Sequence, residues 1–267
     1  MQLQIVHHTA YHYEEAVKYT AQTLRLTPRR EGAQRILSWT ISAPGRRTEQ
    51  LDAHGNITHL LTLEEPHRAI EIDVHGIVEM TGDEAFVRFD GTLSPLAYLA
   101  PTPLTTASPE MVALALEQLA AGGELRERLY RLAGGVYQAV RYMPGTTSVE
   151  DSAAQVFARG QGVCQDQAHV FIACCRAGGI PARYVSGYLC GLDGGDSASH
   201  AWVDAWIEDS QRWLSIDVTH LEPMGPKHCR LAVGRDYLDA APVRGVRRGG
   251  GREVMAVSVA AIASGTQ

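Results

Sequence analysis

The sequence lacks an apolar run long enough to cross a membrane. Its longest such run, Val254 to Ala263, has about half of the roughly 20 residues that a transmembrane helix needs. The segment from Met1 to Tyr13 contains two adjacent histidines and lacks the apolar core of a signal peptide. We therefore expect a cytoplasmic protein that has no membrane partner.

Cysteine and positive charge are also scarce. The five cysteines are an odd number without regular spacing, which favours reduced thiols over a disulfide framework. The formal net charge of −6 argues against a nucleic-acid partner, and the arginine clusters at 29–30 and 244–248 are short. The 267 residues are 45% hydrophobic and 20% charged, which is typical of a globular protein with one large domain or two small ones.

The first hundred residues have the pattern of β-structure. Between Ile70 and His75, apolar and polar residues alternate, so one face of this segment is expected to be buried. Turn-forming pairs and triplets separate the strand-like segments, which are Leu3–Tyr13, Thr20–Thr27, Arg35–Ala43, Arg46–Asp52, Ile57–Leu63 and Ala69–Glu79. Residues 1–105 are predicted to form an N-terminal antiparallel β domain, a small sandwich or barrel.

Helical patterns begin after this region. Ser108 and Pro109 are typical of a helix start, and this helix is expected to reach about Ala120. Further helices are predicted over Glu124–Val140 and Asp151–Arg159. Strands are then predicted at Arg183–Cys190, His200–Ile207, Arg212–Val218 and Glu253–Ile262. Residues 106–267 are therefore assigned to a second, α+β unit that ends with a β-strand.

Cys164 lies where a glycine-rich loop is predicted to enter a helix. Gly160 and Gly162 precede it, and the helix that follows is apolar nearly all round up to Ala177, which indicates burial. The positive end of a helix favours a thiolate, and glycines let the backbone approach a substrate closely. The alternative is a small apolar cysteine that only fills the core.

His200 and Asp217 are related by a pairing argument. If the two strands form a hairpin with a two-residue loop at Asp209-Ser210, Trp202 faces Asp217. His200 and Asp217 then become diagonal neighbours on one face of the sheet, about 7–8 Å apart along the backbone. A three-residue loop would instead place them on opposite faces.

A thiol, an imidazole and a carboxylate together can cleave an amide. The thiolate of Cys164 would attack the carbonyl, His200 would take up and return the proton, and Asp217 would orient the imidazole. The backbone N–H of Cys164 is one candidate donor to the oxyanion. Gln155 and Gln161 are candidates for the second donor.

These residues lie in segments that resemble the transglutaminase-like superfamily. Four segments carry the resemblance, namely Gly162–His169, Gly179–Tyr188, Ser199–Trp202 and Trp213–Asp217. Three C-terminal segments and two N-terminal ones are similar to the bacterial branch with a β-rich N-terminal region: Gly234–Tyr237, Arg244–Gly245, Gly249–Gly251, Leu24–Arg29 and His54–Asn56. One departure stands out, because the family commonly has Pro-Thr-Asn after the aspartate and this chain has Val218-Thr219-His220.

The resemblance implies a papain-like α+β core in which a helix-borne cysteine packs on an antiparallel sheet. It also implies an acyl-enzyme mechanism, as in transglutaminase-like cysteine proteases. The leading hypothesis is a thiol-dependent amide-bond hydrolase, a peptidase or amidase, that acts on a peptide or protein amide. A transglutaminase that transfers amines to glutamine would use the same three residues. A non-catalytic binding module is the hypothesis from another class.

Other features have simpler interpretations. Cys190, Cys229, His220 and His228 show no paired spacing typical of a zinc site, so no metal or other cofactor is expected. Asp166 is expected to cap the first turn of its helix. Core packing is the favoured role for Cys174, Cys175, Trp202 and Trp206, and Gly249–Gly251 is interpreted as a flexible loop near the site.

Overall fold

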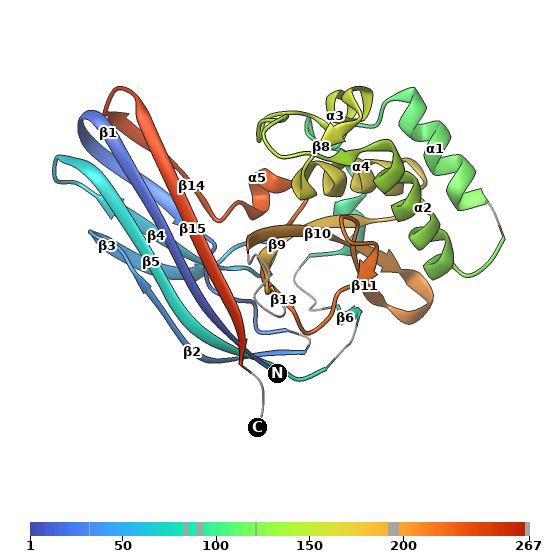
Figure 1. Cartoon of the computed structure of the whole chain (residues 1–267), viewed down its shortest axis with the longest axis horizontal. Coiled ribbons are helices and arrows are strands. Elements are labelled where there is room, and N and C mark those ends of the chain that lie inside the picture. The colour runs from blue at the N-terminus through green and yellow to red at the C-terminus, as the bar shows by residue number, and fades with distance from the viewer. Residues whose placement is uncertain (32, 83–84, 90–92, 121, 192–197, 265–267) are drawn as a thin grey trace.

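The protein is described from a computed structural model that covers residues 1–31, 33–82, 85–89, 93–120, 122–191 and 198–264. Two large antiparallel sheets dominate it, and helices cover one of them (Figure 1). The first sheet has the order β2-β5-β1-β4-β3, with β14 and β15 also paired to β1. Its strands are β1 (Gln2–Leu24), β2 (Gln34–Ser42), β3 (Arg46–Leu51), β4 (Ile57–Leu63), β5 (His67–Met80), β14 (Val243–Gly249) and β15 (Glu253–Ser264).

The long strand β1 bends between His12 and Val17, where its register with β5 shifts. Its first half pairs with β5 and β15, and its second half pairs with β4 and β14. Side chains from both halves share one apolar cluster, which contains Tyr11, Tyr13, Val17, Leu24, Leu26, Ile41, Leu61, Leu63, Ile70, Ile72 and Val74. The sequence predicts two separate segments here and a sandwich or barrel, whereas the structure has one strand and one folded sheet.

Glycines from the C-terminal part of the chain allow the sheet to fold. Gly249, Gly250 and Gly251 have φ of 91°, 97° and 60°, which non-glycine residues rarely adopt. The backbone N–H of Glu15 donates to the carbonyl of Gly250 at the bend of β1. These glycines join β14 to β15 at the corner of the first sheet, away from α4 (Figure 1), so the expectation that they lie near the site is wrong.

The second sheet carries the candidate site and has the order β12-β11-β10-β9-β13, with β6 paired to β11. Its strands are β6 (Phe86–Arg88), β9 (Ala182–Leu189), β10 (Ala198–Ile207), β11 (Arg212–Asp217), β12 (Glu222–Pro223) and β13 (His228–Gly234). The helices are η1 (Pro95–Tyr98), α1 (Pro109–Ala120), α2 (Leu125–Ala139), α3 (Ala153–Arg159), α4 (Cys164–Ala177), η2 (Glu208–Ser210) and α5 (Tyr237–Ala240). A short parallel pair joins β7 (Arg141–Tyr142) to β8 (Gln161–Gly162).

Helix α4 packs on the apolar face of β10. Ala201, Val203 and Ala205 share a core cluster with seven buried residues of α4, as the alternation along β10 predicts. The predicted helices at α1, α2 and α4 are confirmed within one residue at each end. The expected α+β fold, with a helix-borne cysteine packed on an antiparallel sheet, is therefore confirmed.

The two sheets are joined through buried polar contacts. His7 of β1 hydrogen-bonds through Nδ1 to the hydroxyl of Tyr188 of β9 at 2.7 Å. The Asn56 amide donates to the Val233 carbonyl at 2.7 Å and accepts from the Val233 N–H at 2.8 Å. Because β14 and β15 return to β1, the C-terminal part of the chain belongs to the first sheet, and the boundary at residues 105 and 106 stays a prediction.

None of the helices in the described ranges is both long enough and apolar enough to span a lipid bilayer.

Candidate active site

Cys164 is the first residue of α4 and is half-buried. The side chain of Asp166 holds the entry to the helix, because its Oδ2 accepts from the Val163 N–H at 2.8 Å and from the Thr147 hydroxyl at 2.7 Å. A Cβ on Gly162 would lie 2.7 Å from the Asp166 side chain, so this position requires glycine. The expected capping role of Asp166 is confirmed.

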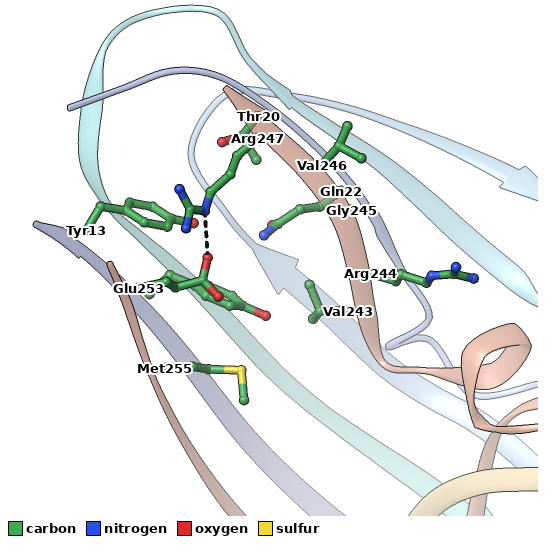
Figure 2. Close-up of a pocket in the computed structure, with 11 residues that line it drawn as sticks. Tyr13, Thr20, Gln22, Val243, Arg244, Gly245, Val246, Arg247, Glu253 and Met255 are labelled. Atoms are coloured by element: carbon green, nitrogen blue, oxygen red, sulfur yellow. Dashed lines mark hydrogen bonds and ion pairs between the residues drawn. The ribbon is translucent and has the colours of Figure 1, made fainter. Parts of the chain in front are cut away.

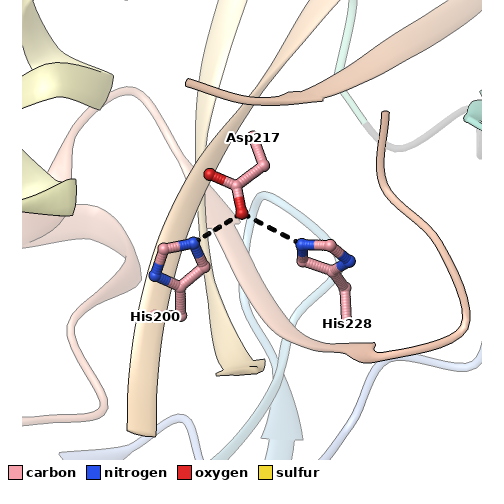
Figure 3. Close-up of side chains that lie close together, drawn as sticks. All are labelled: His200, Asp217 and His228. Carbon is pink, nitrogen blue, oxygen red and sulfur yellow. Dashed lines mark hydrogen bonds and ion pairs between the residues drawn. The ribbon is translucent and has the colours of Figure 1, made fainter. Parts of the chain in front are cut away.

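The β10–β11 hairpin brings His200 to Asp217. Val203 pairs with Ile216 and Trp206 with Trp213, which is the register that the two-residue loop predicts. The turn is the 3-10 helix η2, followed by Gln211 with φ of 53°. The Nε2–H of His200 donates to Asp217 Oδ2 at 2.8 Å (Figure 3).

The electrostatics of this pair favour the charged forms of both groups. Burial disfavours the imidazolium of His200, but hydrogen bonds with Asp217 and Cys164, and their charges, raise its pKa to about 10. Burial alone would raise the pKa of Asp217, but hydrogen bonds from His200, His220 and His228 hold it far below its usual range. Since Nε2 of His200 is occupied by Asp217, the ring nitrogen left for the thiol is Nδ1.

Asp217 is the centre of a larger hydrogen-bond network than the sequence indicates. Its Oδ2 also accepts from His220 Nδ1 at 2.8 Å and from His228 Nε2 at 3.1 Å. Its Oδ1 accepts from the backbone N–H groups of Thr219 and His220 at 3.0 and 3.2 Å. Five donors therefore fix the carboxylate, and the sequence predicts only one of them, His200.

The tautomer of His228 follows from its neighbours. His228 is fully buried, and its Nδ1 accepts from the backbone N–H of Gly225 at 3.1 Å. The hydrogen must then lie on Nε2, which faces Asp217. His228 is thus held as a neutral donor to the carboxylate, opposite His200 in Figure 3.

Although residues 218–220 depart from the family pattern, the loop that they form after Asp217 is held in place by a hydrogen bond to α4. The hydroxyl of Thr219 donates to Gln167 Oε1 at 2.7 Å, and the amide of Gln167 donates to the Val140 carbonyl at 2.8 Å. Because Gln167 belongs to α4, the helix that carries Cys164 is tied to the loop that follows Asp217.

Two tyrosines lie in the electrostatic environment of Cys164. Burial raises the pKa of both Tyr142 and Tyr184, and the charge of Cys164 adds to the increase. The candidate donor Gln155 caps α3 instead, since its Oε1 accepts from the Ser152 N–H and hydroxyl. Gln161 lies in β8 beside Arg141.

Among the described residues, two groups of side chains have the spacing to hold a metal ion: His200, Asp217 and His228, and Asp217, His220 and Glu222. The Nε2 atoms of His200 and His228 carry hydrogens that they already donate to Asp217. A metal ion binds only an unprotonated nitrogen. If it bound Nε2 of His228, the hydrogen would have to move to Nδ1, and Nδ1 could then no longer accept from the Gly225 N–H. Cys190 and Cys229 lie instead in the apolar cluster between the two sheets.

Comparisons with known proteins agree with this geometry. Residues 112–218 match the transglutaminase-like superfamily, and residues 3–79 match the bacterial transglutaminase-like N-terminal region. An uncharacterized protein of Mycobacterium leprae is 32% identical over 272 residues, which cover 93% of this chain and 94% of that protein. A protein-glutamine gamma-glutamyltransferase of Pseudomonas aeruginosa is 32% identical over 117 residues, covering 39% of this chain and 17% of that protein.

Among solved structures, a cysteine protease candidate from Cytophaga hutchinsonii superimposes with a TM-score of 0.78 at 24% identity. The match covers 100% of this chain and 92% of that one. At this identity the likeness establishes the fold. The chain belongs to the transglutaminase-like superfamily, in the bacterial group that carries the N-terminal β region.

Proposed function

We propose that the protein is a thiol-dependent amide-bond hydrolase, a peptidase or amidase. Cys164 is the nucleophile, His200 is the general base and acid, and Asp217 orients the imidazole. The observation that supports this most is the His200–Asp217 hydrogen bond of 2.8 Å, with Cys164 as the second partner of the same imidazole. Members of this superfamily are generally enzymes, and this chain retains the three chemical groups that the reaction needs.

The proposed reaction runs through a thioester. The Cys164 sulfur attacks the amide carbonyl, and the proton of the thiol is held on His200 Nδ1. The tetrahedral oxyanion forms beside the N-terminus of α4, where the Cys164 N–H can donate to it. His200 then gives its proton to the leaving amine as the C–N bond breaks, and water activated by the same imidazole hydrolyses the thioester.

The raised pKa of His200 supports this sequence of steps. An imidazole with a pKa of about 10 holds a proton at neutral pH beside the thiol. The sulfur is therefore paired with an imidazolium, and the proton needed by the leaving amine is already in place. Asp217 keeps its negative charge at neutral pH, which stabilises the imidazolium.

Amine transfer is the second candidate. It is favoured by the 32% identity over 117 residues to the protein-glutamine gamma-glutamyltransferase of Pseudomonas aeruginosa. The first half-reaction would be the same, and an amine would replace water as the acceptor. In either case the substrate is the amide of a peptide or a protein.

Thiol labelling with iodoacetamide tests the nucleophile. Cys174, Cys175 and Cys229 are fully buried and Cys190 is 2% exposed, so Cys164 is expected to be the only cysteine modified in the folded protein. Cys164→Ala should abolish both the labelling and the release of new amino groups from casein. Labelling confined to another cysteine, or turnover that survives in Cys164→Ala, would contradict the proposal.

The acceptor is tested by adding a fluorescent primary amine to the casein reaction. New peptide ends, or ammonia without incorporated fluorescence, support hydrolysis. Fluorescent casein shows amine transfer. A protein that is labelled at Cys164 but releases no product from casein, with or without the amine, would favour the non-catalytic binding module.

A further inference from the structure

Two adjoining cavities open along the edge of the first sheet. The first has a volume of about 240 Å³ and lies where this sheet meets the core, between β1, β15, Ser199 and Tyr237. The second has a volume of about 400 Å³ and continues between β14 and β15 (Figure 2). We call them together the edge groove, and the residues that line both parts of it are Tyr11, Val243 and Met255.

The first cavity lies next to the reactive residues. Ser199 directly precedes His200 on β10. The ring of Tyr237 lies 6.2 Å from that of Tyr184, and the charge of Cys164 contributes, after burial, to the raised pKa of Tyr184. Tyr237, at this end of the edge groove, thus packs on a tyrosine that lies within the electrostatic reach of Cys164.

Two buried polar atoms on side chains that line the second cavity have no hydrogen-bond partner among the described residues. They are the hydroxyl of Tyr13 and the Oε1 of Gln22, on side chains whose residues are only 6% and 7% exposed. Buried polar atoms are nearly always paired. A peptide unit offers both partners, since its carbonyl accepts from a hydroxyl and its N–H donates to an amide oxygen.

The walls of the edge groove are apolar near the core and positively charged beyond it. Met255 and Val257 are 57% and 49% exposed, and they lie on a strand whose pairing partner over this stretch is β1. Arg247 is paired with Glu253 at 3.1 Å (Figure 2), whereas Arg244 is exposed and donates only to the Leu238 carbonyl in the described structure. The excess of positive charge favours an acidic side chain at this end.

We infer that the edge groove binds the substrate polypeptide as an extended chain. An apolar side chain packs against Met255 and Val257, an acidic side chain approaches Arg244, and the peptide backbone satisfies Tyr13 and Gln22. From Val257 to Glu253 the groove spans four residues, or roughly 13 Å at about 3.3 Å per residue. The inference rests on the proposed function, because it places the amide to be cleaved at Cys164.

Binding is measured with the Cys164→Ala protein, so that the probe is not consumed. The probe is a fluorescein-labelled ten-residue peptide in which leucines are followed by glutamates, and the readout is fluorescence anisotropy. Met255→Lys should weaken binding by at least about tenfold. Val254→Lys is the matched control, because Val254 lies on the same strand, is 55% exposed and is outside the edge groove; it should bind as well as the parent.

Two further variants separate binding from folding. Gln22→Leu removes an unpaired buried oxygen, so it should weaken peptide binding while the urea midpoint stays equal or rises. Arg244→Glu should weaken binding of the glutamate peptide and strengthen binding of a matched lysine peptide. Equal binding by Met255→Lys and Val254→Lys would overturn the inference, and so would a dimer of the parent that Met255→Lys converts to monomer.

Failure of the edge groove can be distinguished from failure of the proposed function. If wild-type protein is alkylated at Cys164 and turns over casein, but the peptide binds all variants alike, only the inferred binding of substrate in the edge groove is wrong. If the peptide binds as expected but Cys164 is neither alkylated nor required for turnover, the proposed function is wrong.

Discussion

His228 Nε2 lies 3.1 Å from Asp217 Oδ2 and donates its hydrogen to that oxygen. His228 is fully buried, and its other nitrogen is held by the N–H of Gly225. Its role is therefore to orient the carboxylate, which in turn orients the imidazole of His200. The position of the proposed general base then depends on a strand, β13, that carries no residue of the proposed catalytic set.

We predict that His228→Phe lowers both stability and turnover. The ring volume is nearly kept, but Asp217 loses a donor and the N–H of Gly225 loses its acceptor. The free energy of unfolding should fall by about 1.5–3 kcal/mol, the range for hydrogen bonds to charged groups. Urea unfolding and the kcat for casein measure the two effects.

His220→Ala is the control for this prediction. His220 donates to the same oxygen at 2.8 Å, but its side chain is 42% exposed, so water can replace its hydrogen bond. Its loss of stability should be below about 1 kcal/mol. If His228→Phe behaves like wild type while His220→Ala unfolds, the positioning role belongs to the exposed histidine.

We also predict that the alkaline limit of activity reflects His200. Its pKa is raised to about 10, so the imidazolium that supplies the proton persists at neutral pH. Turnover should decline as the pH rises through about 10. The stability that comes from the raised pKa is fully present below about 6.5 and is lost over the same rise towards 10.

Asp217→Asn tests the origin of this limit. It removes the charge and the acceptor that hold the proton on His200, so the decline in turnover should begin at lower pH. The rate of Cys164 alkylation at pH 6–7 should fall by at least about tenfold, the effect of roughly 1.4 kcal/mol. A decline at an unchanged pH would show that His200 is not the titrating group.

The sequence suffices to predict the pair His200–Asp217 because two independent patterns agree. Apolar residues alternate along β10, and a short polar turn fixes the register, so Val203 is confirmed opposite Ile216. His228 escapes this reasoning because every residue of β13 is buried. Because buried and exposed residues do not alternate along β13, the sequence does not indicate which face of the sheet His228 occupies. Its contact with Asp217 depends on how strands that are distant in the sequence assemble.

The bend in β1 of the first sheet also depends on a contact between residues that are distant in the sequence. Glu14 and Glu15 interrupt an apolar pattern, so the sequence predicts a break in the strand. The structure keeps one strand that bends, because Gly250 near the other end of the chain supplies a matching corner. Local patterns predict the strands, whereas a bend that requires a distant glycine cannot be found locally.

A third prediction concerns the buried ion pairs that Asp204 of β10 makes with Arg183 of β9 and Arg230 of β13. Asp204 accepts from Arg183 at 2.8 Å and from Arg230 at 2.7 and 2.9 Å. Burial opposes its charge, but the two arginines lower its pKa to about 2. Asp204→Asn removes the carboxylate that both buried guanidinium groups contact and leaves Glu31, 3.4 Å from Arg230, as the remaining negative charge. This should destabilise the protein by about 3–5 kcal/mol.

The control for Asp204→Asn is Glu79→Gln, which breaks an ion pair with Arg35 whose side chain is 67% exposed. The cost there should be below about 1 kcal/mol. Urea midpoints at pH 7 measure both. Since the pKa of Asp204 is lowered, its contribution is present above about 3.8 and is lost only as the pH falls towards 2. Equal midpoints for the two variants would contradict the prediction.

The last prediction concerns acid stability at the junction of the two sheets. His7 hydrogen-bonds to Tyr188 and Thr9, and burial, followed by the charge of His8, lowers its pKa to about 4. Between pH 6.5 and 4 the unfolded chain binds a proton at His7 that the folded protein does not. Stability should therefore fall over this range, by up to about 3 kcal/mol from this residue.

Urea unfolding at pH 7, 5 and 4 measures this loss, and His7→Gln should flatten it while lowering the stability at pH 7. His8→Gln is the matched control, because the His8 side chain is 39% exposed and bonds to Asp73 on the outer face. It should keep most of the wild-type dependence on pH, because burial is the larger cause of the lowered pKa of His7 and the charge of His8 the smaller one. If His7→Gln loses stability with acid as steeply as wild type, the sensitivity must come from another buried imidazole. His169 is then the next to test, since burial lowers its pKa to about 3.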